Sequence, residues 1–113
     1  MKITVEALEK YLLDRYGGWT NEQGLFLKLV EEMGEVAEVI NMRAGSKKAA
    51  DVDLQKELGV ELADMIHYIV AIAAINEIDL EKIILEKDKK ASVKYHHEID
   101  LENFLLKQEN EQT

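Results

Sequence analysis

Four acidic residues fall into two matched pairs, and their spacing is the feature of this sequence that could support chemistry. Glu32 and Glu35 stand three residues apart, as do Glu61 and Asp64. With residues placed at about 100° steps around a helix axis, Glu32 and Glu61 fall inside continuous apolar arcs, and Glu35 and Asp64 lie about 60° further round. Acidic side chains are rarely buried unless they are paired or bind a metal. Each helix therefore offers one carboxylate within its apolar stripe and a second beside it.

The two pairs also match in depth along their predicted helices. If one helix ends near Arg43 and the next begins near Asp53, Glu35 and Glu61 each lie eight residues from the connection, about 12 Å along the axis. Glu32 and Asp64 lie further from the connection, about 16 Å along the axis. An antiparallel hairpin would bring all four to one level, where each like-charged pair costs about 4 kcal/mol at ~4 Å and an effective dielectric of about 20. A divalent cation removes that cost, and a set of oxygen ligands predicts Mg²⁺, with Mn²⁺ also possible.

Composition restricts the class of protein. The 113 residues, 47% of them hydrophobic, suit a single ordered domain, with a polar tail predicted from about residue 108. The lack of cysteine excludes disulfides and zinc-thiolate sites. A net charge of −9 argues against nucleic acid as a partner.

Residues 1–6 lack an apolar signal core, and the longest apolar run, 69–75, is too short to cross a bilayer. We expect a cytoplasmic protein with no membrane partner.

Helix signals cover most of the chain and predict an all-α fold of four or five helices. The expected helices span about 4–16, 21–43, 53–76, 80–94 and 101–107. Side-chain caps are expected at Thr4, at Thr20, at Asp51 or Asp53, at Asp79 and at Asp100. The second half of the third helix is apolar all round, so we expect it to be the most buried. Short helices with this much apolar surface predict at least a dimer.

Several other residues have an ordinary explanation beside a functional one. Glu31 and Glu38 lie on the far side of their helix from the apolar stripe, where acidic residues usually face solvent. Lys28 is one turn before Glu32 and suits an ion pair as well as a phosphate contact. Trp19 has the position of a hydrophobic staple outside a helix cap. A run of lysines near the end of the fourth helix is favoured by the helix dipole alone.

At this point the motifs resemble those of a known family. Glu31-Glu32-Met33-Gly34-Glu35, followed by Glu61-Leu62-Ala63-Asp64, is similar to the EExxE…ExxD signature of the MazG-like all-α nucleoside triphosphate pyrophosphohydrolases. The resemblance extends from about Trp19 to Tyr95. It implies an oligomeric helical bundle, a dimer or tetramer, that hydrolyses a nucleoside or deoxynucleoside triphosphate to the monophosphate and pyrophosphate with Mg²⁺. The metal ligands it implies are Glu32, Glu35, Glu61 and Asp64.

The fourth helix matches the same family incompletely. Lys87, Lys94 and Tyr95 fit the register of its substrate-contacting residues, but Lys94 replaces an arginine and Ala91 replaces an asparagine. The resemblance therefore does not fix the substrate.

The mechanism expected from these residues is attack of water on the α-phosphorus. Glu31, or the member of the acidic quartet that is least engaged with the metal, would orient or deprotonate that water. Lys28, Lys87 and Lys94 would contact phosphates, and Trp19 and Tyr95 are candidates for the base or sugar. Two alternatives stay open: a pyrophosphohydrolase of another diphosphate metabolite such as phosphoribosyl-ATP, and a non-catalytic helical module that binds metal or a basic partner.

Overall fold

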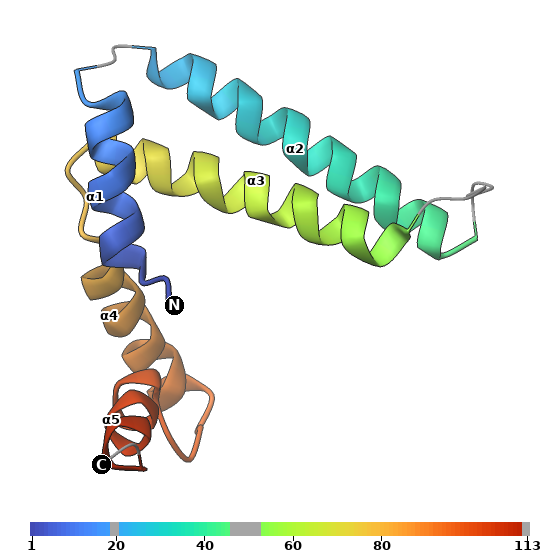
Figure 1. The fold of residues 1–113 in the computed structure, drawn as a ribbon. Coiled ribbons are helices and arrows are strands. Elements are labelled where there is room, and N and C mark those ends of the chain that lie inside the picture. Colours follow the sequence, from blue (N-terminus) through green and yellow to red (C-terminus); the bar gives the residue numbers. More distant parts are fainter. Residues whose placement is uncertain (19–20, 46–52, 112–113) are drawn as a thin grey trace. The chain divides into compact units, whose positions relative to one another are not determined.

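The computed structural model describes residues 1–18, 21–45 and 53–111, and these residues form five helices and no strand (Figure 1). The helices are α1 (Val5–Tyr16), α2 (Glu22–Arg43), α3 (Leu54–Ile75), α4 (Leu80–Lys94) and α5 (Leu101–Glu111). The predicted all-α fold class is confirmed.

The helices form two compact units, Met1–Ile78 and Asp79–Thr113. In the first unit α3 packs against both α2 and α1, and in the second α4 packs against α5. The single domain expected for the whole chain stays a prediction.

Predicted caps begin the first, third and fourth helices as expected. Side-chain oxygens of Thr4, Asp53 and Asp79 accept hydrogen bonds from the backbone N–H three residues later, at 3.0, 3.1 and 3.2 Å. Each bond satisfies one of the N–H groups that have no partner within the first helical turn. Local sequence therefore sets where α1, α3 and α4 begin.

The start of α2 differs from the prediction by one residue. The N-cap is Asn21, whose Oδ1 accepts the N–H of Gly24 at 2.9 Å. The predicted cap at Thr20 is therefore wrong. Asparagine caps helices at least as well as threonine, which explains why the neighbouring Asn21 can take this position. Thr20 and Trp19 themselves lie outside the described residues.

The last helix is longer than predicted. Asp100 accepts the N–H of Asn103 at 2.9 Å, as expected of a cap, but α5 continues to Glu111 instead of ending near Lys107. The predicted polar tail from about 108 is thus helical as far as Glu111. Neither glycine nor proline follows Lys107, and glutamine and glutamate are good helix formers.

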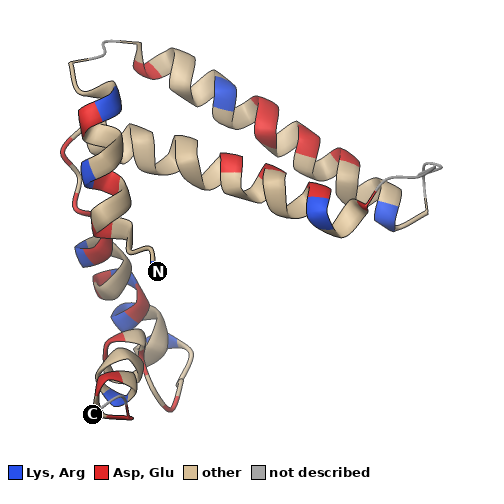
Figure 2. Cartoon of the chain, in the orientation of Figure 1, with Lys and Arg blue, Asp and Glu red and all other residues tan. Residues whose placement is uncertain are grey.

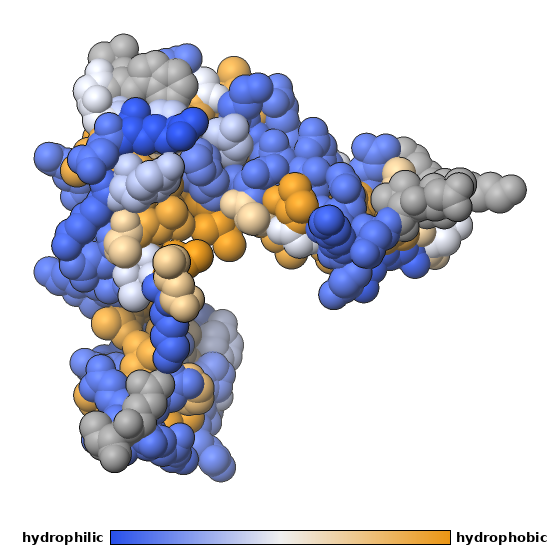
Figure 3. Space-filling view, viewed as in Figure 1, coloured by the Kyte–Doolittle hydropathy of each residue, from blue (hydrophilic) through white to orange (hydrophobic). Residues whose placement is uncertain are grey.

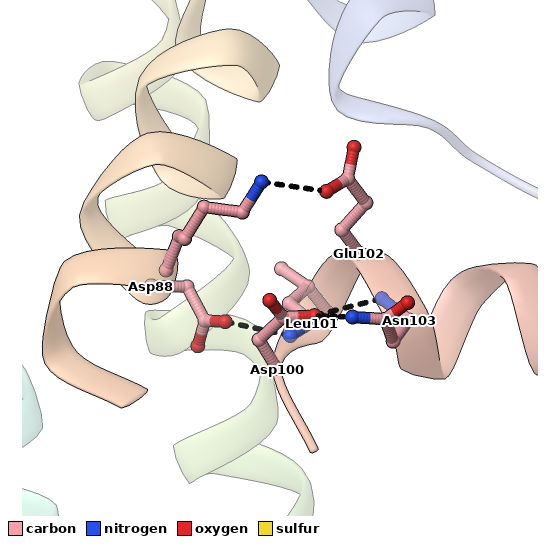
Figure 4. A network of polar contacts seen from close by, with 6 residues as sticks. Asp88, Asp100, Leu101, Glu102 and Asn103 are labelled. Atoms are coloured by element: carbon pink, nitrogen blue, oxygen red, sulfur yellow. Dashed lines mark hydrogen bonds and ion pairs between the residues drawn. The ribbon is translucent and has the colours of Figure 1, made fainter. Parts of the chain in front are cut away.

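Polar contacts join α4 to the start of α5 (Figure 4). Asp88 Oδ2 accepts the N–H of Leu101 at 2.6 Å, and Lys89 pairs with Glu102 at 3.0 Å. Both contacts lie at the N-terminal end of α5, where a helix has backbone N–H groups to satisfy. They fix the turn between these two helices.

The core of the first unit lies along the second half of α3. Val70, Ala71, Ala73 and Ala74 are all buried, which confirms the expectation for this segment. By length and composition α3 could also cross a membrane. The same properties belong to a core helix, and α3 is the helix against which both α1 and α2 pack.

Candidate active site

Acidic side chains from α2 and α3 meet within the hairpin that these two helices form. Figure 2 shows acidic residues along both helices. One carboxylate oxygen from each of Glu32, Glu61 and Asp64 lies within 4.8 Å of the other two. The structure thus brings together three of the four residues predicted as metal ligands, and we call them the carboxylate cluster.

Burial makes this cluster different from an acidic surface. Glu61 is only 8% exposed, and Glu32 and Asp64 are half-buried. The buried Oε2 atoms of Glu32 and Glu61 have no hydrogen-bond partner among the described residues. Buried polar atoms nearly always have a partner, and an orphaned one indicates a missing water or ion.

Glu35 stands beside the cluster and is exposed. Hydrogen bonding of the Glu61 carboxyl group to Glu35, then to Glu32, followed by burial and the charges of the same neighbours, raises the pKa of Glu61 from 4.5 to about 8. A carboxyl group that shares a proton with neighbouring carboxylates is stabilised in its neutral form. Without a cation, Glu61 therefore keeps its proton at neutral pH.

The residues of the cluster fit a hard divalent cation. All the donor atoms are carboxylate oxygens, with neither sulfur nor imidazole among them, which is the donor set of Mg²⁺ and Mn²⁺. Opposite ligands of an octahedral Mg²⁺ stand about 4.2 Å apart at a bond length of ~2.1 Å. The three oxygens lie within 4.8 Å of one another, so a small side-chain adjustment would let all three hold one ion, whose other ligands would be water or substrate oxygens.

Glu31 and Lys28 lie outside the cluster and pair with each other. Lys28 Nζ is 3.4 Å from Glu31 Oε2, and their side chains are 58% and 62% exposed. This is the ordinary ion pair that the sequence allowed for Lys28, at a spacing typical of exposed helix pairs.

The other predicted substrate residues lie elsewhere in the chain. Lys87, Lys94 and Tyr95 are exposed and belong to the unit Asp79–Thr113. Lys94 Nζ lies 5.3 Å from the centre of the Tyr95 ring, a cation–π contact. Ala91, which replaces the family's asparagine, is half-buried in α4. Trp19 lies outside the described residues.

A polar contact joins α1 to α3, and the sequence did not indicate it. Tyr16 Oη and His67 Nε2 are 2.9 Å apart, and their rings meet edge to face at 5.7 Å. The ring of Tyr68 meets His67 in the same way at 5.0 Å. Burial raises the pKa of Tyr68, as does, to a smaller extent, the charge of Tyr16. Only the three-dimensional packing of α1 reveals this contact, because its partners lie 51 residues apart.

A groove of about 500 Å³ lies next to the cluster, between α2 and α3. It is lined by residues of both helices: Glu35, Glu38, Val39, Met42, Leu54, Glu57 and Glu61. Glu38 is exposed, as expected, and it also borders this groove. One signal was available, because Glu35, Glu38 and Met42 recur at the spacing of one helix face.

Three comparisons with known proteins agree with this geometry. The model of the MazG nucleotide pyrophosphohydrolase domain matches residues 20–98. A Bacillus subtilis (strain 168) protein described as uncharacterized, YpjD, is 27% identical over 82 residues, which cover 73% of this chain and 74% of the relative. The crystal structure of iMazG from Vibrio DAT 722 is similar with a TM-score of 0.63 and 30% identity, covering 82% of this chain and 98% of that chain.

Proposed function

Because this chain belongs to the MazG nucleotide pyrophosphohydrolase family, we propose that it hydrolyses a nucleoside or deoxynucleoside triphosphate to the monophosphate and pyrophosphate with Mg²⁺. One observation carries the proposal beyond the family. Three carboxylates converge within 4.8 Å, and two of them have buried oxygens without a partner. Such a site suits a cation bridged to an anionic substrate better than it suits an empty core.

In this proposal Glu32, Glu61 and Asp64 hold the metal. Bound there, Mg²⁺ would neutralise charge on the phosphates and favour a nucleophilic water. Glu61 would lose its proton on binding the metal, and Glu35, which faces the Glu61 carboxyl group, would then be free to accept a hydrogen bond from the attacking water. The two helices fix these side chains before substrate arrives, so little reorganisation is needed.

Two glutamates are candidates to orient or deprotonate the attacking water. Glu31 is exposed and paired with Lys28, so it acts in this role only if the substrate breaks that pair. Glu35 raises the pKa of the neighbouring Glu61 and is the quartet member outside the three-acid cluster. This position favours Glu35 as the residue that orients or deprotonates the attacking water. Glu31 and Lys28 would then lie at the edge of the site, near the phosphates.

The remaining substrate contacts are proposed from the family pattern. Lys28, Lys87 and Lys94 would bind phosphate oxygens as compact positive charges. Trp19 and Tyr95 would contact the base or the sugar.

Exposed apolar residues support assembly into a homodimer or homotetramer. Phe26, Val30 and Met33 on α2, and Leu62, Ile66 and Ile69 on α3, are each between 43% and 54% exposed. Figure 3 shows hydrophobic residues at the surface of this hairpin. Both sets recur at the spacing of one helix face, so each forms a stripe that a second copy could cover. The cytoplasmic location, without nucleic-acid or membrane partners, stays a prediction from composition.

A screen for pyrophosphate release tests the proposed function. Canonical, deoxy and damaged nucleoside triphosphates, and phosphoribosyl-ATP, are each incubated with Mg²⁺ or Mn²⁺, and pyrophosphate and monophosphate are measured. We expect release from a triphosphate with either metal and none in EDTA. Binding of nucleotide without any turnover would instead identify a non-catalytic module.

A further inference from the structure

Two exposed stripes run along the hairpin of α2 and α3, and both lack charged residues. Successive members of each stripe stand alternately three and four residues apart, which is the spacing by which one helix packs along another in a bundle. The stripes consist of Phe26, Val30, Met33, Ala37 and Ile40 on α2, and of Gly59, Leu62, Ile66 and Ile69 on α3. All of these residues are exposed.

The two stripes face the same side of the hairpin. Each is centred about 100° round its helix from the side that faces the other helix. Because the two helices run antiparallel, equal rotations in one sense lead to one side of the pair. Glu35 and Asp64 are rotated in the opposite sense, by about 60° from Glu32 and Glu61, and Glu35 lines the groove on that other side. The stripes therefore form one continuous surface, the apolar face, away from the open side of the carboxylate cluster.

The hairpin is thinly packed at the level of the cluster. The structure describes every residue of α2 and α3, and the buried ones are Leu25 and Val39 on α2, and Glu61, Val70, Ala71, Ala73 and Ala74 on α3. Leu25 and Val39 lie seven residues to either side of Glu32, and Val70 lies nine residues after Glu61, about 10 and 14 Å along the axes. Between them, no apolar side chain of either helix is more than half-buried.

A second copy of this chain is the partner that suits the apolar face. With a net charge of −9, most surfaces of two copies repel one another. The apolar face is uncharged across both helices, so it can pair with itself about a twofold axis without burying like charges. The four helices would then enclose Met33 and Leu62 at the level of the cluster, where one copy alone has little packing.

We propose that Mg²⁺ binding at the carboxylate cluster and pairing of two copies through the apolar face strengthen each other. This inference rests on the proposed function, whose metal site and second copy it links. Met33 directly follows Glu32, and Leu62 directly follows Glu61, so packing against a second copy would fix the segments that carry the ligands. A site that is already ordered binds more tightly, because less ordering is left to the binding step. By linkage, the ion must then strengthen the pair by the same factor for each site.

Sedimentation equilibrium of the full chain tests this coupling without turnover. The dimer dissociation constant is measured in saturating Mg²⁺ and in EDTA, with Na⁺ added to match the ionic strength, because any cation screens repulsion between acidic copies. We expect the constant to be about tenfold lower or more in Mg²⁺. Asp64→Asn should remove most of this difference. Asp14→Asn removes the same charge from an exposed position on α1 and should preserve it.

The reverse measurement changes the apolar face and records metal binding. Val30→Gln and Ile66→Gln each place a neutral polar group in the face and should raise the dimer dissociation constant about tenfold or more, the effect of losing one or two buried methylene groups. Calorimetry at a concentration where only the wild type is a dimer should show about fivefold weaker Mg²⁺ binding in the variant. Val93→Gln, at a 75% exposed position on α4, is the control and should change neither quantity. Circular dichroism checks each fold, and either face variant suffices.

Three results would overturn the inference. They are a monomer at every concentration, as expected if residues 79–113 cover the face, an equal dimer dissociation constant in Mg²⁺ and in EDTA, and wild-type Mg²⁺ affinity in a folded, monomeric face variant. Pyrophosphate release by the same wild-type samples would leave the proposed hydrolysis standing in each case. Failure to release pyrophosphate from every nucleotide overturns the proposed hydrolysis itself, and the sedimentation result then still decides the coupling.

Discussion

Proton release on metal binding is the most direct test of the carboxylate cluster. The Glu61 carboxyl group is protonated in the metal-free protein up to a pKa of about 8, and a metal ligand must be deprotonated. Mg²⁺ must therefore displace this proton at any lower pH. At pH 6, two units below this pKa, only about one Glu61 carboxyl group in a hundred is deprotonated. The apparent affinity for Mg²⁺ at pH 6 should therefore be about one hundredth of the affinity reached well above pH 8.

Isothermal titration calorimetry measures this displacement. The heat of Mg²⁺ binding is recorded at pH 6.5 in two buffers with different enthalpies of ionisation, and the difference gives the number of protons released. We expect nearly one proton per ion at pH 6.5, almost none at pH 9, and almost none at either pH for Glu61→Gln. Mg²⁺ binding of equal affinity at pH 6.5 and pH 9, without proton release, would show that Glu61 holds no proton for the metal to displace.

The same pKa predicts how the stability of the metal-free protein depends on pH. The folded pKa of Glu61 lies above its ordinary value of 4.5, so its protonation stabilises the folded state. That contribution is fully present below about pH 4.5 and is lost as pH rises through about 8. Melting temperatures in EDTA should fall between pH 6 and pH 9 in wild type by more than they fall in Glu61→Gln. A saturating concentration of Mg²⁺ should reduce the difference between the two proteins.

The remaining predictions concern metal, catalysis, assembly and packing. Thermal unfolding in Mg²⁺ at one hundred times its Kd should show about 2.7 kcal/mol more stability than in EDTA, and identical midpoints would argue against a metal site. Glu35→Gln and Asp64→Asn should each lower turnover by orders of magnitude with the helical circular dichroism preserved, because metal-assisted charge stabilisation is worth several kcal/mol; turnover equal to wild type would place the active site elsewhere. Glu31→Gln should lower turnover less than Glu35→Gln, which a parallel kinetic assay would check. Light scattering at micromolar concentration should give at least a dimer, and a monomer would contradict the assembly. Tyr16→Phe should lower the free energy of unfolding by about 0.5–1.5 kcal/mol, the net value of one hydrogen bond, measured by urea denaturation.

Most of the helices could be predicted from the sequence, because caps and apolar periodicity depend only on residues within a few positions of one another. Asp53 and Asp79 cap the helices they were expected to cap, and the apolar second half of α3 is buried as its composition indicated. The errors fall at helix ends. Asn21 and Thr20 are both good caps, so sequence alone could not choose between neighbours, and α5 continues because nothing after Lys107 breaks a helix.

The helical wheel predicted the cluster well, but not the contacts between helices. Glu32 and Glu61 were expected inside apolar stripes, and their Oε2 atoms are buried. The wheel put Glu35 at the edge of its stripe, where it is exposed beside Glu61 instead of within the three-acid cluster. The groove and the Tyr16–His67 contact depend on the spacing and rotation of packed helices, which the periodicity of one helix does not contain.

The uneven packing along α3 has a consequence for its backbone amides. Small alanines pack closely near its C-terminal end, whereas Glu61 and the half-buried Asp64 of the carboxylate cluster stand near its middle. Local opening of the metal-free protein should therefore begin on the side of Leu54 and stop before Val70, so that hydrogen–deuterium exchange is fast at the first three turns and slow at the last two. A cation at the cluster would join α3 to α2 and slow exchange mainly in the first half. The half of α3 that carries Glu61 and Asp64 would then be the one that the metal makes rigid.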